Sequence, residues 1–377
     1  MTAPATVGGP APGRPQLTLG GRAIPVVLPR GDDPRLKLSA VIMTLHVLGQ
    51  TVLGFKVSIA QIIVSIGVCG VVEAALTFRS LHSLVWPASG ILTGSSVAFI
   101  LRASGTSHGD WWSLHGIQFF VLAGLVSLLS KHLIRPTGRH LFNPSNIGLV
   151  WCLLVIGPNH VFAQYLWWGP NRLGVALAYG VILGGAVWIL RSVGMIPMAL
   201  SFLVTFAVLI GGLALAGRSF IAIWHDGPIS GPSYWATIAL SPELLVFVFF
   251  MISDPQTAPK APVGRVAYGA AVAAVAAGLV SFQPTELGIK VAILTSLTVV
   301  CALVPLIEHL SQRPRPERPA ERQGRPWSAS LAAGARRPAV VAAVIIAVAA
   351  PLDAAALAGN KKVILIERGQ VGARNPQ

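Results

Sequence analysis

Apolar runs alternate with short polar segments along most of the chain, from about residue 38 to residue 310. A helix needs about 20 apolar residues to cross a bilayer, and ten of the runs approach that length. The expected spans are 38–55, 57–76, 84–101, 115–134, 146–163, 173–190, 196–216, 237–253, 266–282 and 287–307. Several are short for a straight crossing, which indicates tilted or half-length helices. The pattern predicts an all-α polytopic membrane protein with about ten transmembrane helices.

The segments that flank this core differ from it in composition. Residues 1–37 are rich in Pro, Gly and Arg, which is typical of an arm without fixed structure. Residues 311–338 form a Pro/Arg-rich linker, and residues 339–377 contain an Ala/Val-rich stretch that is a candidate eleventh span. The ten-helix membrane domain is therefore expected over residues 38–310.

Charge sets the expected orientation. Charged residues make up 11% of the chain, against about 25% in soluble domains. The net charge of +15 comes from Lys and Arg in loops, without the aromatic interleaving of a nucleic-acid surface. A cytoplasmic N-terminus puts most of these cations on the cytoplasmic side, as the positive-inside rule requires, and leaves Lys290 among those of the other side. We expect a multi-pass protein of the bacterial plasma membrane, surrounded by lipid and binding no nucleic acid.

Tryptophan is concentrated in the three longer outward loops. The residues concerned are Trp111, Trp112, Trp167, Trp168, Trp224 and Trp235. Tryptophan is enriched where a membrane meets water, so a belt at the lipid interface is one interpretation. The alternative is a stacking platform for a flavin or quinone ring.

Stand-alone catalytic motifs are absent from the sequence, which has no Walker loop and no HExxH. Cys69, Cys152 and Cys301 each stand alone in an apolar run, so no metal site is expected. An enzymatic role would be that of a subunit in a membrane oxidoreductase, and no catalytic residue is assigned.

Two polar segments interrupt the apolar pattern at the expected cytoplasmic side. In the first, Asn143 and Pro144 open a span after an Arg-rich loop; this is either a capped helix start or an anion site at a helix N-terminus. In the second, Asp254 follows a strongly apolar run and precedes Thr257 and Lys260. A carboxylate there must lie at the membrane surface or in a protein-lined cavity, with Lys260 or Arg265 as its expected partner. A third segment, 79–96, is rich in small residues, which favour close helix packing or a ligand-lining helix.

These segments together resemble the RnfD/NqrB family, the flavin-carrying membrane subunits of the Rnf complex and of Na⁺-translocating NADH:quinone reductase. The resemblance rests on Phe142-Asn143-Pro144 and on the run 253–259, followed by Gly264-Arg265 and Tyr268-Gly269. It implies ten helices in two inverted five-helix repeats and a flavin- or quinone-binding electron-transfer subunit with redox partner subunits. It also implies that Asn143, Asp254, Thr257 and Lys260 shape a cofactor site.

One departure from the family concerns covalent flavin. Members that carry FMN attach it through a phosphoester to a Thr in the outward loop after the Asn-Pro helix. Here that loop is 157–172, which contains no Thr and no Ser. Covalent FMN is therefore predicted to be absent, with Thr237 as the nearest substitute, and any FMN or riboflavin is expected to bind noncovalently.

The sequence also resembles the UnbU-type membrane proteins of enediyne gene clusters, a subgroup of the same family. That resemblance implies a role in secondary metabolism. The alternative function is a transporter or an export and self-resistance component that uses the same inverted-repeat cavity without redox chemistry. The visible spectrum of the purified protein would separate the two hypotheses.

Overall fold

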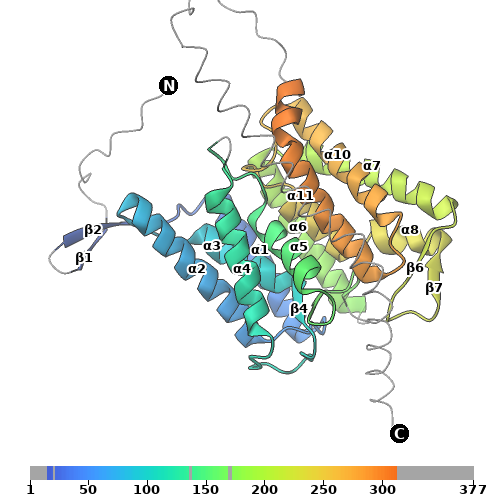
Figure 1. The fold of residues 1–377 in the computed structure, drawn as a ribbon, viewed down its shortest axis with the longest axis horizontal. Coiled ribbons are helices and arrows are strands. Elements are labelled where there is room, and N and C mark those ends of the chain that lie inside the picture. The colour runs from blue at the N-terminus through green and yellow to red at the C-terminus, as the bar shows by residue number, and fades with distance from the viewer. Residues whose placement is uncertain (1–14, 20–21, 136–137, 169–171, 312–377) are drawn as a thin grey trace, which may run out of the picture.

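The computed structural model describes residues 15–19, 22–135, 138–168 and 172–311. Within these residues the chain forms a bundle of helices with short strands at its ends (Figure 1). Each of the ten expected spans overlaps at least one helical segment of the bundle, and 237–253 overlaps three. The Pro/Arg-rich linker beyond residue 311 and the candidate eleventh span lie outside the described residues.

The first half of the bundle contains five helical segments. They are α1 (Pro34–Thr51), α2 (Ile59–Leu81), α3 (Ala88–Ile100), α4 (Ile117–Leu133) and α5 (Pro144–Trp151), which continues as the π-helical turn η1 (Cys152–Ile156). Local sequence sets several starts. Ser58 and Gln61 form a reciprocal capping box at α2, and Asp33 and Asn143 cap α1 and α5 ahead of a proline.

The second half begins with two long helices and continues with a broken one. The segments are α6 (Arg172–Val193), α7 (Ile196–Leu215), α8 (Gly231–Ala239), α9 (Pro242–Val246) with the π-helical turn η2 (Phe247–Met251), α10 (Pro262–Val280) and α11 (Glu286–Ser311). The break between α8 and α9 falls at Ser241-Pro242, because Pro242 lacks the N–H needed to continue a helix. Ser241 caps the new start by accepting from the backbone N–H of Leu244.

Short strands form before α1 and in the segments that connect the helices. They are β1 (Gln16–Leu19), β2 (Arg22–Val27), β3 (Leu84–Val85), β4 (Leu101–Ala103), β5 (Val161–Ala163), β6 (Ser219–Ile221) and β7 (Pro228–Ser230). The expectation of an unstructured arm over residues 1–37 is wrong for the hairpin β1–β2. Its second strand also pairs in parallel with β3 after α2, so backbone hydrogen bonds and the neighbouring helix order a segment that composition alone marks as loose.

Six helices in the described part of the chain are long and apolar enough to cross a membrane. They are Ile59–Leu81, Arg172–Val193, Ile196–Leu215, Gly231–Met251, Pro262–Val280 and Glu286–Ile307. Three shorter apolar helices, Ala88–Ile100, Ile117–Leu133 and Pro144–Ile156, lie among them. The protein is thus a multi-pass helical membrane protein. The finer expectation, ten crossings in two inverted repeats, stays a prediction.

Small residues bring α2 and α3 into close contact. A Cβ atom on Gly94 would lie 2.3 Å from the carbonyl oxygen of Ser65, and one on Gly90 would lie 2.5 Å from that of Cys69. No side chain fits at either position without moving the α2 backbone. The small-residue segment 79–96 therefore serves helix packing, the first of the two interpretations that the sequence allows.

The two halves of the bundle meet at two pairs of helices: α1 packs on α6, and α5 packs on α11. The bundle has two ends. The Asp-Pro end holds the start of α5 and the loop after η2, around Asn143 and Asp254. The aromatic end holds the loop 157–168, the start of α11 and the β6–β7 loop; it lies toward the bottom of Figure 1, where β4 is labelled. Helices α5–η1 and α9–η2 both run from one end to the other.

Candidate functional site

Asn143 joins the two interrupted helices at the Asp-Pro end. Its side-chain oxygen caps α5 by accepting from the backbone N–H of Asn146 at 3.1 Å. Its amide nitrogen donates to the carbonyl oxygen of Met251, the last residue of η2, at 3.1 Å. One buried side chain therefore satisfies the N-terminus of one helix and the C-terminus of another. Of the two interpretations of this segment, the capped helix start matches the observed geometry.

Asp254 lies just beyond η2 and has a partner that the sequence analysis did not name. Its Oδ2 lies 3.3 Å from Nε2 of His140, which comes from the loop before α5. Its Oδ1 accepts from the backbone N–H of Gln256. Arg265, expected beside this carboxylate, instead donates to the carbonyl oxygens of Pro259 and Gly194. Arg265 is close to Asp254 in the sequence, but α10 begins at Pro262 and carries Arg265 away from the Asp254 turn.

Thr257 completes this end of the bundle. It is 2% exposed, and its hydroxyl donates to the carbonyl oxygen of Asp254 at 3.3 Å. It also interacts with Tyr268, whose hydroxyl lies 3.5 Å from the thiol of Cys301. Lys260 is exposed on the same loop. Of the four predicted site residues, Asn143, Asp254 and Thr257 thus gather at one end of the bundle, and Lys260 lies at its rim.

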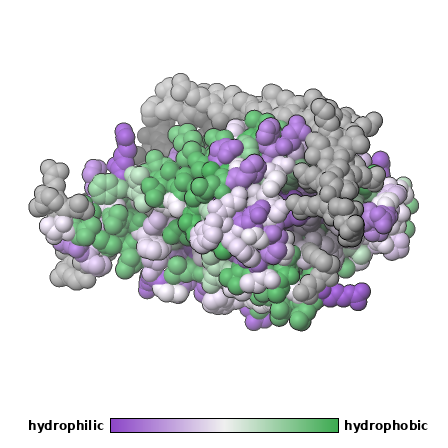
Figure 2. Space-filling model, turned by 90° about the horizontal axis from the view of Figure 1, so that it is seen from below, coloured by the Kyte–Doolittle hydropathy of each residue, from purple (hydrophilic) through white to green (hydrophobic). Residues whose placement is uncertain are grey.

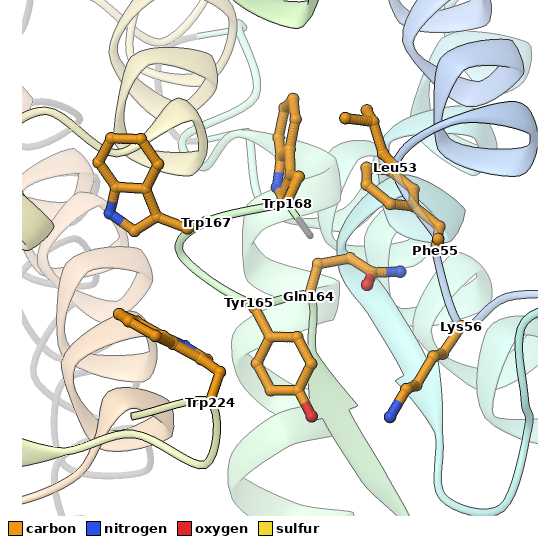
Figure 3. Close-up of a pocket in the computed structure, with 9 residues that line it drawn as sticks. Leu53, Phe55, Lys56, Gln164, Tyr165, Trp167, Trp168 and Trp224 are labelled. Carbon is orange, nitrogen blue, oxygen red and sulfur yellow. The ribbon is translucent and has the colours of Figure 1, made fainter. Parts of the chain in front are cut away.

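A pocket of about 540 Å³ opens at the aromatic end. Figure 3 shows Trp167 and Trp224 on one side, Leu53, Phe55 and Lys56 on the other, and Trp168, Gln164 and Tyr165 between them. The first group comes from the loop after β5 and from the β6–β7 loop, and the second from the loop between α1 and α2. Seen from below in Figure 2, this end shows pale and hydrophilic residues across its middle with hydrophobic ones beside them.

The tryptophans divide between the two interpretations that the sequence allows. Trp112 is 71% exposed and Trp111 is 40% exposed, as an interfacial belt requires. Trp168 is only 2% exposed; its ring packs at 5.4 Å from both Phe55 and Phe99. Trp167, Trp168 and Trp224 line one pocket, and Trp224 is also 43% exposed.

Buried charges lie directly behind this wall. Trp168 donates from Nε1 to Oε2 of Glu243 at 3.0 Å, and Trp224 donates from Nε1 to Oε2 of Glu286 at 2.7 Å. Glu286 also accepts from the backbone N–H of Leu166 at 2.6 Å. The two carboxylates thus fix the two loops that form the pocket. Each hydrogen bond to a carboxylate is stronger than one between neutral groups.

Two cations accompany these carboxylates. Arg102, from β4, is 6% exposed and lies 4.7 Å from the ring centre of Tyr165. Lys290, one turn into α11, is 3% exposed and interacts electrostatically with Glu243 and Glu286. The charge count assigns Lys290 to the outward side; in the structure it lies near the start of α11, with its side chain buried in the bundle.

The sequence analysis missed this cluster, although a signal was available. Glu243, Glu286 and Lys290 stand in or beside apolar runs, and ionisable residues in such positions are functional candidates by default. These three residues belong to none of the motifs described above, so those motifs do not point to them. No group of three or more His, Cys, Asp and Glu side chains that could hold a metal ion occurs among the described residues.

Comparison with known proteins identifies the second half of the chain. Residues 159–316 match the model of the NQR2, RnfD, RnfE family. That segment includes the pocket loop after β5, the Asp254 turn and α11. A comparison with curated proteins gives no significant match. The resemblance inferred from the sequence motifs is supported at the level of the family: residues 159–316 of this membrane protein are similar to the NQR2, RnfD, RnfE family, and this segment contains the Asp-Pro motif.

Proposed function

We propose that this protein is a membrane-embedded electron-transfer subunit that binds a flavin or quinone ring noncovalently in the pocket at the aromatic end. Members of its family work as membrane subunits of multisubunit complexes, which supports redox partner subunits for this chain as well. The observation that carries the proposal is the pocket itself.

Size and chemistry of the pocket both suit a planar ring. Its volume of about 540 Å³ lies within the range of roughly 300–1,000 Å³ usual for small-molecule sites. Trp167 and Trp224 offer faces for stacking, and Gln164 and Lys56 add polar groups. The loop that builds much of this wall, 157–172, is also the one in which the family resemblance places the flavin.

Noncovalent binding is inferred from the absence of Thr and Ser from that loop. The substitute that the sequence offers, Thr237, lies close by, because its carbonyl oxygen accepts from Nε1 of Trp167 at 3.0 Å. A denaturing gel of protein made with a flavin transferase tests this point. We expect no fluorescent band; a band lost in Thr237→Ala would show covalent attachment at that residue.

The visible spectrum of the purified protein is the main test. We expect flavin absorbance near one flavin per chain, or tight binding of added riboflavin or menadione. Trp167→Ala should weaken riboflavin binding about fivefold, as expected for loss of one stacking contact of about 1 kcal/mol. Trp112→Ala is the matched control and should leave binding unchanged. A colourless protein that binds neither ring but moves a small molecule across vesicles would favour the transporter alternative.

The site that the family resemblance implies at the Asp-Pro end is a further part of the proposal. There Asn143, Asp254 and Thr257 would shape a second cofactor contact, with Lys260 at its rim. A role beside enediyne biosynthesis, suggested by the UnbU-type resemblance, stays a prediction.

Orientation in the bacterial plasma membrane, with a cytoplasmic N-terminus, is proposed from loop charges. Cys69, Cys152 and Cys301 are buried, so a cysteine introduced at an exposed position can be labelled selectively. Trp112→Cys at the aromatic end should react with an impermeant thiol reagent in intact cells. Lys260→Cys at the Asp-Pro end should react only after lysis; the opposite result would reverse the orientation.

A further inference from the structure

The strongest observation outside the proposed binding contacts is a buried amine without a hydrogen-bond partner. Lys290 is 3% exposed, and among the described residues its Nζ atom has no hydrogen-bond acceptor. A buried unpaired ammonium is costly in free energy. Proteins keep such a group inside a membrane mainly where it has a function.

A small void lies between this amine and a carboxylate. It measures about 20 Å³ and is lined by Lys290 and Glu243 and otherwise by apolar side chains, among them Ile100 and Phe247. A cavity needs roughly 10–15 Å³ to hold one water molecule. The void therefore has room for one water molecule, with the amine and the carboxylate as its polar partners.

Glu243 also touches the wall of the aromatic pocket. Its Oε2 accepts from Nε1 of Trp168, whose ring lines the pocket. Glu286, by contrast, is held by two donors and forms the fixed partner of the cluster. Of the two buried carboxylates, Glu243 is the one that faces both the void and the indole.

We propose that Glu243 and Lys290, with the water-sized void between them, form a proton-binding site that controls ring binding through Trp168. The inference rests on the proposed function, since it needs a ring in the pocket. When Glu243 is ionised, its charge-assisted hydrogen bond holds the indole in place. When Glu243 is protonated, it is a weaker acceptor, the indole is held less firmly, and the ring binds less tightly.

The charged and titratable groups around Glu243 set the balance between its ionised and protonated forms. Arg102 approaches from β4 and interacts with both Glu286 and Lys290. Glu286 and Lys290 approach from α11, while Tyr179 of α6 donates to the carbonyl oxygen of Leu240 just ahead of α9. The positive charge of Lys290 and the hydrogen bond from Trp168 favour the ionised form of Glu243, whereas burial and the negative charge of Glu286 oppose it. The interacting groups titrate as a unit.

The test uses the full chain in lipid nanodiscs and measures riboflavin affinity between pH 5 and pH 9. Affinity should fall about fivefold from high to low pH, because a charge-assisted hydrogen bond is roughly twice as strong as a neutral one. Glu243→Gln should bind weakly at every pH. Trp168→Phe, which keeps a ring but removes the N–H donor, should also lose the pH dependence. Lys290→Met should move the transition to higher pH, because the carboxylate loses its cation.

A second readout does not need the ring. Infrared spectra recorded across the same pH range should show a protonated carboxyl band that disappears in Glu243→Gln. The matched control is Glu73→Gln, because Glu73 of α2 is a buried carboxylate that pairs with Lys131 of α4. This variant should keep both the band and the pH-dependent affinity.

The outcomes separate the two proposals. If riboflavin and menadione bind at no pH, the proposed function fails, and the infrared band alone decides whether the proton site exists. If riboflavin binds with the same pH dependence in wild type and in Glu243→Gln, or the band persists in that variant, the proton site is refuted and the ring pocket stands.

Discussion

At the Asp-Pro end, most buried polar side chains form their hydrogen bonds within the protein, although Oδ1 of Asn146 has no donor among the described residues. Asn143 joins α5 to η2, and the hydroxyl of Thr257 is bound to the turn that starts at Asp254. At the aromatic end, three donors among the described residues have no acceptor: Nε of Arg102, Nε2 of Gln164 and Nζ of Lys290. The first arrangement is what a fold needs to fix two helix ends. The second leaves donors beside a pocket, where a ligand or water can satisfy them.

The difference teaches that a specific sequence motif and an open site need not coincide. The Asn-Pro and Asp-Pro motifs carry the resemblance to the family, yet the side chains of Asn143 and Thr257 are hydrogen-bonded within the protein. The aromatic end has no motif of comparable specificity, yet it holds a pocket of about 540 Å³. Four substitutions test whether the two ends really differ in this way.

Glu286→Ala should have the largest effect. It removes the acceptor for the backbone of Leu166 and for Trp224 and leaves Lys290 and Arg102 without its charge. Breaking a buried charge network of this kind costs about 3 kcal/mol or more. Thermal unfolding in nanodiscs measures the loss. Glu286→Gln keeps one acceptor and should lose much less; equal melting temperatures for Glu286→Ala and wild type would mean that the cluster is not structural.

Asn143→Ala should come next, at about 2 kcal/mol. The change removes a helix cap and leaves the buried carbonyl of Met251 without its donor. Ser145→Ala is the control, since the hydroxyl of Ser145 donates only to Asn143. The same thermal assay applies. A loss no greater than that of the control would show that Asn143 is free for another role, and the contrast between the ends would weaken.

Asp33→Ala measures how much an ordinary helix cap, outside both ends of the bundle, contributes to stability. Asp33 caps α1, and hydrogen bonds from Arg35 lower the pKa of its carboxyl. Its contribution, about 1 kcal/mol, is present above the unfolded-state pKa of roughly 4 and is lost as the pH falls through the lower folded-state value. Melting temperatures of variant and wild type should therefore converge in acid. Asp32→Ala, with a side chain 81% exposed, should match wild type throughout.

Asp254→Asn should have the smallest effect on stability. Its side chain is 20% exposed, and Asn can still accept from the backbone N–H of Gln256, so we expect a change of at most about 0.5 kcal/mol. If the Asp-Pro end shapes a cofactor site, the ratio of cofactor to protein should drop nevertheless. Cofactor content and thermal stability measured side by side decide this. An unchanged ratio would assign the Asp-Pro end a purely structural role.

Local patterns in the sequence determined much of the fold. Apolar runs predict the helices because a bilayer demands continuous apolar surface. The caps at Asn143 and Ser58 follow from residue types that satisfy free backbone N–H groups. The Asn-Pro and Asp-Pro motifs are local as well, which is why the family could be inferred before the structure. Predictions from the nearest charge in sequence were less dependable, as His140 beside Asp254 demonstrates.

Only the tertiary structure decided which distant residues meet. Asn143 contacts Met251 across 108 positions, and Trp168 contacts Glu243 across 75. The wall of the aromatic pocket is drawn from loops that are separated in the same way. The sequence contains each side chain, but contact between them depends on how the helices pack, because packing sets the distances between loops. For that reason the spans, caps and family follow from the sequence, whereas the pocket, the burial of Lys290 and its link to Glu243 follow from the fold.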